Sequence, residues 1–543
     1  MSLRIDPHSY TNDMHWGEHI ARKVVEAFPN EELYTCAAGI SPSGIVHFGN
    51  FRDVITAYVV SKELEKMGKK TRVLFSWDDF DRLRKVPANV PEIFAENIGK
   101  PLAMIASPFS TDESYAKFFE TPMEQAMTRL GITLTYRYQS KEYTSGVYSD
   151  AIVEALRARK EIAKILLSFM TEKAMEEKKI SASEYVEQFY PVSVYSRFTG
   201  KDATEIRSYD DSSELLTYYC HETKQEDSIN VRTSGLVKLQ WKVDWPMRWR
   251  HESVVFEPGG HDHASPGSSY DIATVIAPTI FHRSAPVFAE YKFVGLSGLG
   301  AKMSGSKGNA VSPLQLLEIY EPEVLKWLYM KKTPAQAFTL AFDTEIYRQF
   351  DEFDREVELY KENKLDAFSM RALELSLENN KTIFENTPIP FRQAVAFGQI
   401  AQWDLQKMTE LLSRSGLSYS THSITSRLPC AKNWLMKYNP SEMIVVRDVV
   451  NRDYITTLNE ASRLNIKALA DFLDGEIDSI EQLEKMLYAI PKDETLDQKE
   501  NAKRQRAFFK DVYQLLISTD TGPRLSTFIW ALGKEKVRTL LAV

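Results

Sequence analysis

Two glycine- and serine-rich stretches of the sequence carry side chains suited to phosphate chemistry. The first contains His47 and Asn50, whose N–H groups can bind phosphate oxygens. The second contains Lys302 and Lys307 on a loop that can close over phosphates and then release them. Chemistry at phosphate groups requires stabilisation of the negative charge on their oxygens. Such side chains supply that stabilisation by position and charge, without a covalent intermediate.

The first stretch, Ala38–Asn50, lies between a predicted strand and a predicted helix. The apolar run Leu33–Ala38 predicts a buried strand, and Arg52–Met67 predicts the helix. The tight turn between them contains Ser41, Ser43 and Gly44. In an open α/β sheet, a ligand binds at the carboxyl end of such a strand. His47 and Asn50 share one face of the helix start, beside the positive end of its dipole.

Acidic residues follow a second predicted strand, Lys70–Trp77. The order strand, helix, strand predicts one βαβ unit, with Asp78 and Asp79 at the carboxyl end of the second strand. A buried ammonium group requires a carboxylate partner, so these residues can hold a cationic side chain. The alternative is a surface ion-pair cluster with the cations that follow, which are Arg82, Arg84 and Lys85.

A third candidate region surrounds the predicted strand Val254–Glu257. The loop Gly259–His263 follows it, faces the same cleft, and can bind ribose hydroxyl groups or the carboxylate of an amino acid. A metal site is the alternative, although a catalytic zinc usually has three protein ligands. Trp245 offers an aromatic surface for an aliphatic chain or an ammonium group, and a place in the hydrophobic core is the alternative.

The composition is that of an ordinary globular protein, and the few cysteines fit a reducing compartment. Its 543 residues predict two to four domains, and 43% of them are hydrophobic. No apolar run approaches the ~18 residues that a membrane span needs, and the polar N-terminus has no signal-peptide core. Three cysteines give no disulfide framework. We therefore expect a cytoplasmic protein without a membrane partner. The net charge of −8 argues against indiscriminate binding of nucleic acid, but not against a tRNA partner that meets a local basic surface.

The expected fold is α/β, with a Rossmann-like parallel-sheet catalytic domain, an inserted domain and an all-α C-terminal region. The predicted domains are 1–83 with 231–320 for the Rossmann-type domain, 84–230 for the insertion, 321–387 for a helical linker and 388–543 for the C-terminal helices. The strand pattern stops near residue 84, and we expect the sheet to resume at Leu236–Val243. Pro388 and Pro390 cannot continue a helix, so they predict a joint.

The two phosphate-binding stretches resemble the HIGH and KMSKS signatures of class I aminoacyl-tRNA synthetases. They read His-Phe-Gly-Asn and Lys-Met-Ser-Gly-Ser-Lys. Asn50 stands where the second histidine of the first signature usually lies, and Gly305 stands where the second lysine would be, so we take Lys307 as its substitute. The glycine–serine form of the loop resembles the lysine-specific members. Three further runs share that resemblance: Trp77–Asp81, Lys242–Trp249 and Ser268–Asp271.

The resemblance implies roles for individual residues. The expected catalytic residues are His47, Asn50, Lys302 and Lys307. The expected ATP-binding residues are Pro42, Ser43, Gly44, His47, Gly49, Asn50, Gly260, Asp262, Lys302, Met303, Ser304, Gly305, Ser306 and Lys307. The expected lysine-binding residues are Gly39, Ser41, Asp78, Asp79, Trp245, His261 and Tyr270.

The resemblance also implies a reaction and its partners. Lysine and ATP would give lysyl-adenylate, and the lysyl group would pass to the 3′ end of tRNA-Lys. Mg²⁺ would accompany ATP, and the enzyme would be a monomer. The insertion would meet the acceptor end of the tRNA, and the C-terminal helices would meet the anticodon. Related enzymes often bind zinc in the insertion; here only Cys220-His221 remains, without a paired C-x-x-C, so we expect no zinc.

Three other functions stay open at this point. A nucleotidyl transferase of the same superfamily would act on a small acid without RNA, but it would need neither the insertion nor the long helical region. A class I synthetase for another amino acid, such as glutamate or cysteine, would share both signatures. A non-catalytic RNA-binding relative would not need to retain both loops.

Overall fold

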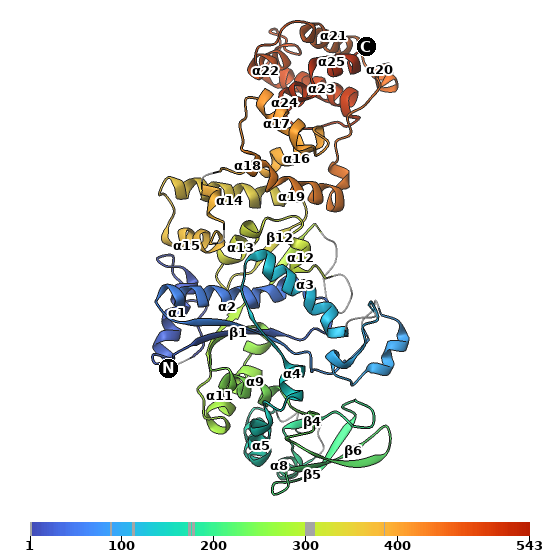
Figure 1. Cartoon of the computed structure of the whole chain (residues 1–543). Coiled ribbons are helices and arrows are strands. Elements are labelled where there is room, and N and C mark those ends of the chain that lie inside the picture. Colours follow the sequence, from blue (N-terminus) through green and yellow to red (C-terminus); the bar gives the residue numbers. More distant parts are fainter. Residues whose placement is uncertain are drawn as a thin grey trace. The chain divides into compact units, whose positions relative to one another are not determined.

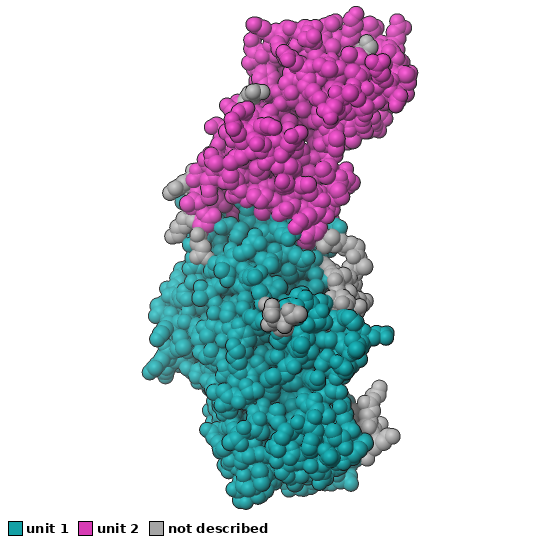
Figure 2. Space-filling view, turned by 45° about the vertical axis from the view of Figure 1, so that its right-hand side comes forward, with its two compact units in different colours: residues 1–340, 358–379 teal, residues 341–357, 380–543 magenta. Residues whose placement is uncertain are grey.

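The computed structural model describes residues 3–86, 90–110, 114–171, 175, 180–298, 310–378, 380–384 and 386–542 (Figure 1). The chain forms two compact units, residues 1–340 with 358–379 and residues 341–357 with 380–543 (Figure 2). None of the described helices is both long and apolar enough to cross a membrane. The finer domain boundaries given above stay a prediction.

A five-stranded parallel sheet lies at the centre of the first unit. Its strands, in spatial order, are β10 (Val287–Tyr291), β9 (Val254–Gly260), β1 (Tyr34–Ile40), β2 (Thr71–Trp77) and β3 (Thr135–Tyr138). The chain adds strands on one side of β1 first and on the other side later. The order therefore reverses at β1, and ligands of such sheets bind in the crevice at that point. The parallel α/β fold predicted from the sequence is confirmed.

Helices cover both faces of this sheet. The helices α1 (Trp16–Ala27) and α2 (Phe48–Lys66) lie on one face, and α9 (Trp241–His251) and α11 (Ser269–Ile280) lie on the other (Figure 1). Strand β1 is buried from Tyr34 to Ala38. A parallel strand covered on both faces consists of a continuous apolar run, which is why the sequence pattern identified it.

Two strand predictions differ from the structure. The prediction that the sheet resumes at Leu236–Val243 is wrong, because β8 (Val237–Leu239) pairs antiparallel with β4 (Val192–Val194), and α9 begins at Trp241. Conversely, β3 belongs to the central sheet although it lies within the range 84–230 that we assigned to the insertion. Its Thr-Tyr-Arg-Tyr sequence is only half-buried at the sheet edge, so it has no apolar run to reveal it.

Most of the remaining elements of the first unit lie between β2 and β9 in the chain. They are η1 (Glu92–Asn97), η2 (Leu102–Met104), α3 (Tyr115–Leu130), α4 (Gln139–Thr144), α5 (Ser149–Arg157), α6 (Arg159–Ser168), α8 (Ala182–Gln188), β5 (Thr204–Asp210), β6 (Leu215–Cys220) and β7 (Gln225–Asn230). The strands β5, β6 and β7 form an antiparallel sheet of their own. The short helix α10 (His261–Ala264) lies between β9 and α11. After β10 come β11 (Val294–Ser297), α12 (Pro313–Leu316), α13 (Pro322–Met330), β12 (Phe338–Ala341) and α15 (Ala367–Ser376).

The second unit is helical throughout its described residues. Its elements are α14 (Glu345–Lys361, whose last residues belong to the first unit), η4 (Lys381–Phe384), α16 (Phe391–Ile400), α17 (Leu405–Arg414), α18 (Thr421–Thr425), α19 (Leu428–Asn433), η5 (Trp434–Tyr438), η6 (Pro440–Glu442), α20 (Arg452–Thr457), α21 (Glu460–Asp474), α22 (Ile480–Ala489), α23 (Gln498–Ile517), α24 (Leu525–Leu532) and α25 (Lys534–Leu540). The helices α21 to α25 share one core, which includes Leu469, Leu487, Leu516 and Phe528. The predicted all-α C-terminal region is confirmed.

A buried ion pair joins two helices of the second unit. Arg427, whose side chain is 0% exposed, donates two hydrogen bonds to the carboxylate of Asp354 on α14, at 2.6 and 2.5 Å. It also donates to the backbone carbonyl of Ile389 at 3.0 Å. A guanidinium group so far from water depends on these acceptors.

We expect Asp354→Ala to lower the free energy of unfolding by about 3–5 kcal/mol, because it leaves the Arg427 charge buried without its carboxylate. Guanidinium denaturation of the full chain measures this effect. The control is Glu352→Ala on the same helix, whose partner Arg348 is 62% exposed, and we expect it to cost less than about 1 kcal/mol. Equal effects of the two substitutions would contradict the prediction.

Candidate active site

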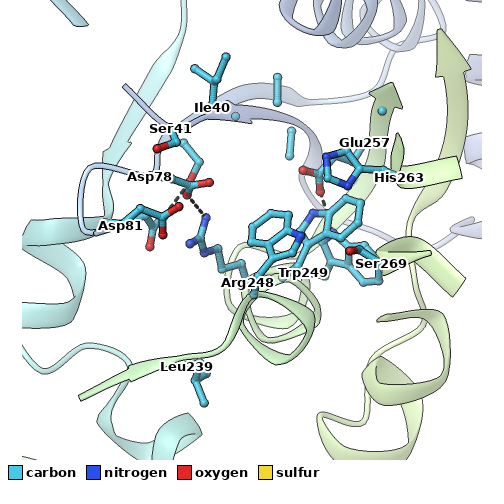
Figure 3. A pocket seen from close by; sticks show the side chains of 18 of the residues that line it. Ile40, Ser41, Asp78, Asp81, Leu239, Arg248, Trp249, Glu257, His263 and Ser269 are labelled. Carbon is cyan, nitrogen blue, oxygen red and sulfur yellow. Dashed lines mark hydrogen bonds and ion pairs between the residues drawn. The ribbon is translucent and has the colours of Figure 1, made fainter. Parts of the chain in front are cut away.

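A cavity of about 760 Å³ opens at the carboxyl ends of β1, β2 and β9, where the strand order reverses (Figure 3). Residues from α2 and α9 complete its walls. The sequence-predicted residues that line it are Gly39, Ser41, Asn50, Asp78, Trp245 and Asp262. The structure therefore brings together residues from four separate regions of the chain.

His47 and Asn50 form the N-terminal cap of α2. The Nδ1 atom of His47 accepts a hydrogen bond from the backbone N–H of Gly49 at 3.0 Å. The Oδ1 atom of Asn50 accepts one from the backbone N–H of His47 at 3.1 Å. Burial lowers the pKa of His47, so the ring is neutral and its proton lies on Nε2. Each side chain keeps an N–H donor beside the positive end of the helix.

The described residues that follow the predicted lysine loop contact this same helix end. Lys302, Met303, Ser304, Gly305, Ser306 and Lys307 lie outside the described residues, so their predicted roles stay predictions. The chain after them returns to α2, because the backbone N–H of Phe48 donates to the carbonyl of Val311 at 3.0 Å. The Tyr329 hydroxyl donates to the carbonyl of Phe48 at 2.8 Å. The loop therefore ends next to the donors of the helix cap.

Ion pairs occupy one end of the cavity (Figure 3). Arg248 on α9 pairs with Asp78 at 2.5 Å and also with Asp244. Burial raises the pKa of Asp78, and the guanidinium group opposes that effect. Asp81, in the same loop as Asp78, pairs with Lys238. The charge of Asp78 is therefore already matched by a cation of the protein.

Asp79, the other acidic residue predicted to bind lysine, does not line the cavity. Its carboxylate accepts hydrogen bonds from the backbone N–H of Ser140 at 2.7 Å and from the hydroxyl of the same residue. The Asp79 side chain is 3% exposed. Asp79 therefore fixes the start of α4, whereas its neighbour Asp78 faces the cavity and pairs with Arg248.

Aromatic rings and one carboxylate form the opposite end (Figure 3). Trp245 lies with its ring centroid 5.1 Å from that of Trp241 and 5.1 Å from that of Trp249. The Nε1–H of Trp249 donates to Glu257 on β9 at 2.7 Å. Burial raises the pKa of Glu257 to about 7. From the sequence we named Trp245 as a site residue but missed Glu257 and Arg248. For Arg248 a signal existed: the tryptophans of α9 are four residues apart, as are Asp244 and Arg248, and this spacing places each set on one face of a helix.

The structure places the other predicted residues away from the cavity wall. Tyr270 is 1% exposed, donates to the carbonyl of Pro286 at 3.1 Å and stacks on Phe288, so it belongs to the core. The His261 ring is 72% exposed and lies 3.0 Å from Glu290. The remaining ones are Pro42, Ser43, Gly44, His47, Gly49 and Gly260, each within three residues of a lining residue in the chain. Within the described ranges, no three His, Cys, Asp or Glu side chains are grouped so that they could hold a metal ion.

Comparisons with known proteins agree along nearly the whole chain. A family described as tRNA synthetases class I (K) matches residues 14–379. The chain is 34% identical to a lysine–tRNA ligase of Streptomyces coelicolor, over 98% of this chain and 98% of that protein. It is 34% identical to a lysine–tRNA ligase of Treponema pallidum over the same shares. It is also 34% identical to one of Thermococcus kodakarensis, over 96% of this chain and 98% of that protein.

We expect Glu257→Gln to stabilise the ligand-free protein at pH 8. The pKa of Glu257 is about 7 in the folded chain against an ordinary value of 4.5. The contribution that protonation of Glu257 makes to the free energy of unfolding is complete below pH 4.5 and is lost as the pH rises through 7. Removing the charge recovers at most about 3 kcal/mol at pH 8, because the carboxyl group borders the cavity and stays partly solvated. The gain in Tm over the wild type should be larger at pH 8 than at pH 5, and equal gains would contradict the prediction.

Proposed function

Because the chain belongs to the class I tRNA synthetases (K), we propose that its cavity carries out the reaction of a lysine–tRNA ligase. One observation carries the proposal: the similarity to lysine–tRNA ligases extends over 98% of the chain. The enzyme activates L-lysine with ATP to form lysyl-adenylate and pyrophosphate. The lysyl group then passes to the 3′ end of tRNA-Lys. The alternative, a nucleotidyl transferase that acts on a small acid without RNA, does not explain why the similarity includes the helical second unit.

The first step takes place at the N-terminus of α2. A carboxylate oxygen of lysine attacks the α-phosphorus of ATP, the bond to the bridging oxygen breaks, and pyrophosphate leaves with the electron pair. The free N–H donors of His47 and Asn50 bind the phosphate oxygens. Lys302 and Lys307 come from the loop before Val311, whose carbonyl accepts from Phe48, and they stabilise the charge of the departing pyrophosphate.

Mg²⁺ accompanies ATP in this proposal and neutralises part of the phosphate charge. Phosphate oxygens and water supply most of its ligands, as is usual for this ion. The protein's own contribution is to orient the two substrates and to exclude water from the reacting atoms. We place the enzyme in the cytoplasm, as a monomer that meets tRNA-Lys there.

The lysine substrate lies in the cavity beside β1. Gly39 and Ser41 line the wall at the end of that strand, so backbone and hydroxyl groups there can bind the polar atoms of an amino acid. Trp245 lines the same cavity and offers an apolar surface for the four methylene groups. The neighbouring carboxylate Asp78 already has Arg248 as its partner.

The test of this function is amino-acid-dependent ATP–pyrophosphate exchange with all twenty amino acids, with and without total tRNA. We expect exchange with lysine and not with glutamate or cysteine. Formation of lysyl-tRNA from the same mixture completes the test. Absence of exchange with every amino acid under both conditions would remove the ligase function and leave an RNA-binding relative as the better account.

We expect Lys302→Ala and Lys307→Ala each to lower kcat of the exchange roughly 100-fold, because each removes a cation that stabilises the transition state. The KM for lysine should change little. Lys364→Ala is the matched control, since Lys364 is a 65% exposed lysine of the same unit. If Lys307→Ala keeps full exchange activity, Lys307 is not the substitute for the missing second lysine of the signature.

A further inference from the structure

We propose that Glu257 is the carboxylate that pairs with the side-chain ammonium group of the lysine substrate. In this arrangement the indole rings of Trp245 and Trp249 enclose the methylene chain. The inference rests on the proposed function and assigns lysine specificity to a residue that the sequence motifs did not single out. The carboxylates of the cavity, the aromatic wall and the strand register each support it.

Most carboxylates of the cavity already have a cationic partner. Seven carboxyl side chains line it: Asp53, Asp78, Asp81, Asp202, Glu252, Glu257 and Asp262. Four of them form ion pairs, Asp78 with Arg248, Asp81 with Lys238, Asp202 with Arg82, and Glu252 with Arg72. An additional ammonium group gains little beside a charge that is already neutralised. The partner of the substrate is therefore among the other three.

Of those three, Glu257 has the surroundings that call for a cation. Asp262 is exposed, so water screens its charge. Asp53 is held by the backbone N–H of Gly39 at 3.1 Å and by the side chain of Tyr291, so it joins α2 to the ends of β1 and β10, and it has no indole ring as a partner. Glu257 accepts the Nε1–H of Trp249 at 2.7 Å, and the indole of Trp245 also lowers its pKa; both partners are neutral. Across the described part of the chain, it forms no ion pair with a Lys, Arg or His.

The groups that surround Glu257 do not supply the missing charge. Burial raises its pKa to about 7, and Arg248 lowers it only in part, because that guanidinium group is bound to Asp78 and Asp244. His263 also lines the cavity (Figure 3), and burial lowers the pKa of its ring, so it is neutral. A bound ammonium group would hold Glu257 ionised at neutral pH.

The aromatic wall suits an aliphatic chain that ends in a cation. The rings of Trp241 and Trp245 are stacked at an interplanar angle of 16°, and the ring of Trp249 meets Trp245 at 54°. Methylene groups gain hydrophobic contact against such a surface. An ammonium group near the ring faces is attracted by their quadrupoles, and it reaches the carboxylate that Trp249 holds.

The register of the strands fits the length of lysine. Phe256 of β9 pairs with Cys36 of β1, so Glu257 lies level with Ala37. Gly39 is two residues closer to the carboxyl end, a rise of roughly 6.6 Å. An extended lysine side chain spans a similar length. A lysine whose carboxylate lies near Gly39 therefore places its ammonium group beside Glu257, and shorter amino acids do not reach it.

The test compares L-lysine with L-norleucine, which has nearly the same chain without the ammonium group. The lysine KM and the norleucine inhibition constant are measured by ATP–pyrophosphate exchange with the full-length wild type and with Glu257→Gln. We expect the substitution to raise the KM for lysine about 100-fold or more, since it removes one partner of a buried charge pair. The KM for ATP and the inhibition constant of norleucine should stay within about threefold, which separates loss of ammonium recognition from general damage.

Two further variants keep the inference falsifiable. Glu142→Gln on α4 serves as the control and should leave all constants unchanged, because Glu142 does not line the cavity. If Asp53→Asn abolishes the preference for lysine over norleucine and Glu257→Gln does not, Asp53 is the partner and the inference is wrong. A Glu257→Gln protein that keeps the full preference for lysine would also overturn it. If the wild type shows no exchange with lysine, the proposed function fails, which is a different result.

Discussion

The buried charge of Arg248 is the constraint on which the walls of the cavity depend. Its side chain is 8% exposed, and a guanidinium group in that position requires carboxylate partners. Asp78 supplies one from the end of β2, and Asp244 supplies the other from one turn earlier on α9. Tyr143 on α4 donates to Asp244 at 2.6 Å. One charge thus holds α9, β2 and α4 in a single arrangement.

The same arrangement explains why some carboxylates of the cavity are paired with cations of the protein and Glu257 is not. At one end Asp78 and Asp81 are matched by cations of the protein, so they hold structure in place. At the other end Glu257 borders the cavity with neutral partners, and burial raises its pKa. A group that is costly in the empty protein and is stabilised by a ligand is typical of a binding site, where stability is given up for function.

The side chains that cap the N-terminus of α2 keep donors for a ligand. His47 uses Nδ1 to cap the helix, which leaves the Nε2–H free for a ligand. Asn50 uses its carbonyl oxygen in the same way, and its amide donors stay available. Because Phe48 of this turn also binds the backbone of Val311, the end of the lysine loop and the phosphate donors share one anchor.

Much of the fold could be predicted because the responsible interactions are local. Strand β1 is buried on both faces, so its apolar run appears in the sequence, and the turn before α2 has its own small residues. Strand β3 escaped prediction because an edge strand is only half-buried. The strand at Val237–Leu239 was predicted with the wrong partner, since a three-residue strand with two apolar side chains does not specify which strand it pairs with.

The sequence by itself determined which chemical groups this protein has and which of them are neighbours along one helix or turn. His47 and Asn50 at a helix start, and the tryptophans of α9, belong to that part. Only the tertiary structure decided which charges cancel. Asp78 and Arg248 are 170 residues apart in the chain and 2.5 Å apart in space. Electrostatic energy depends on distance in space and on burial, so sequence patterns could not show that Asp78 was occupied and that Glu257 was not.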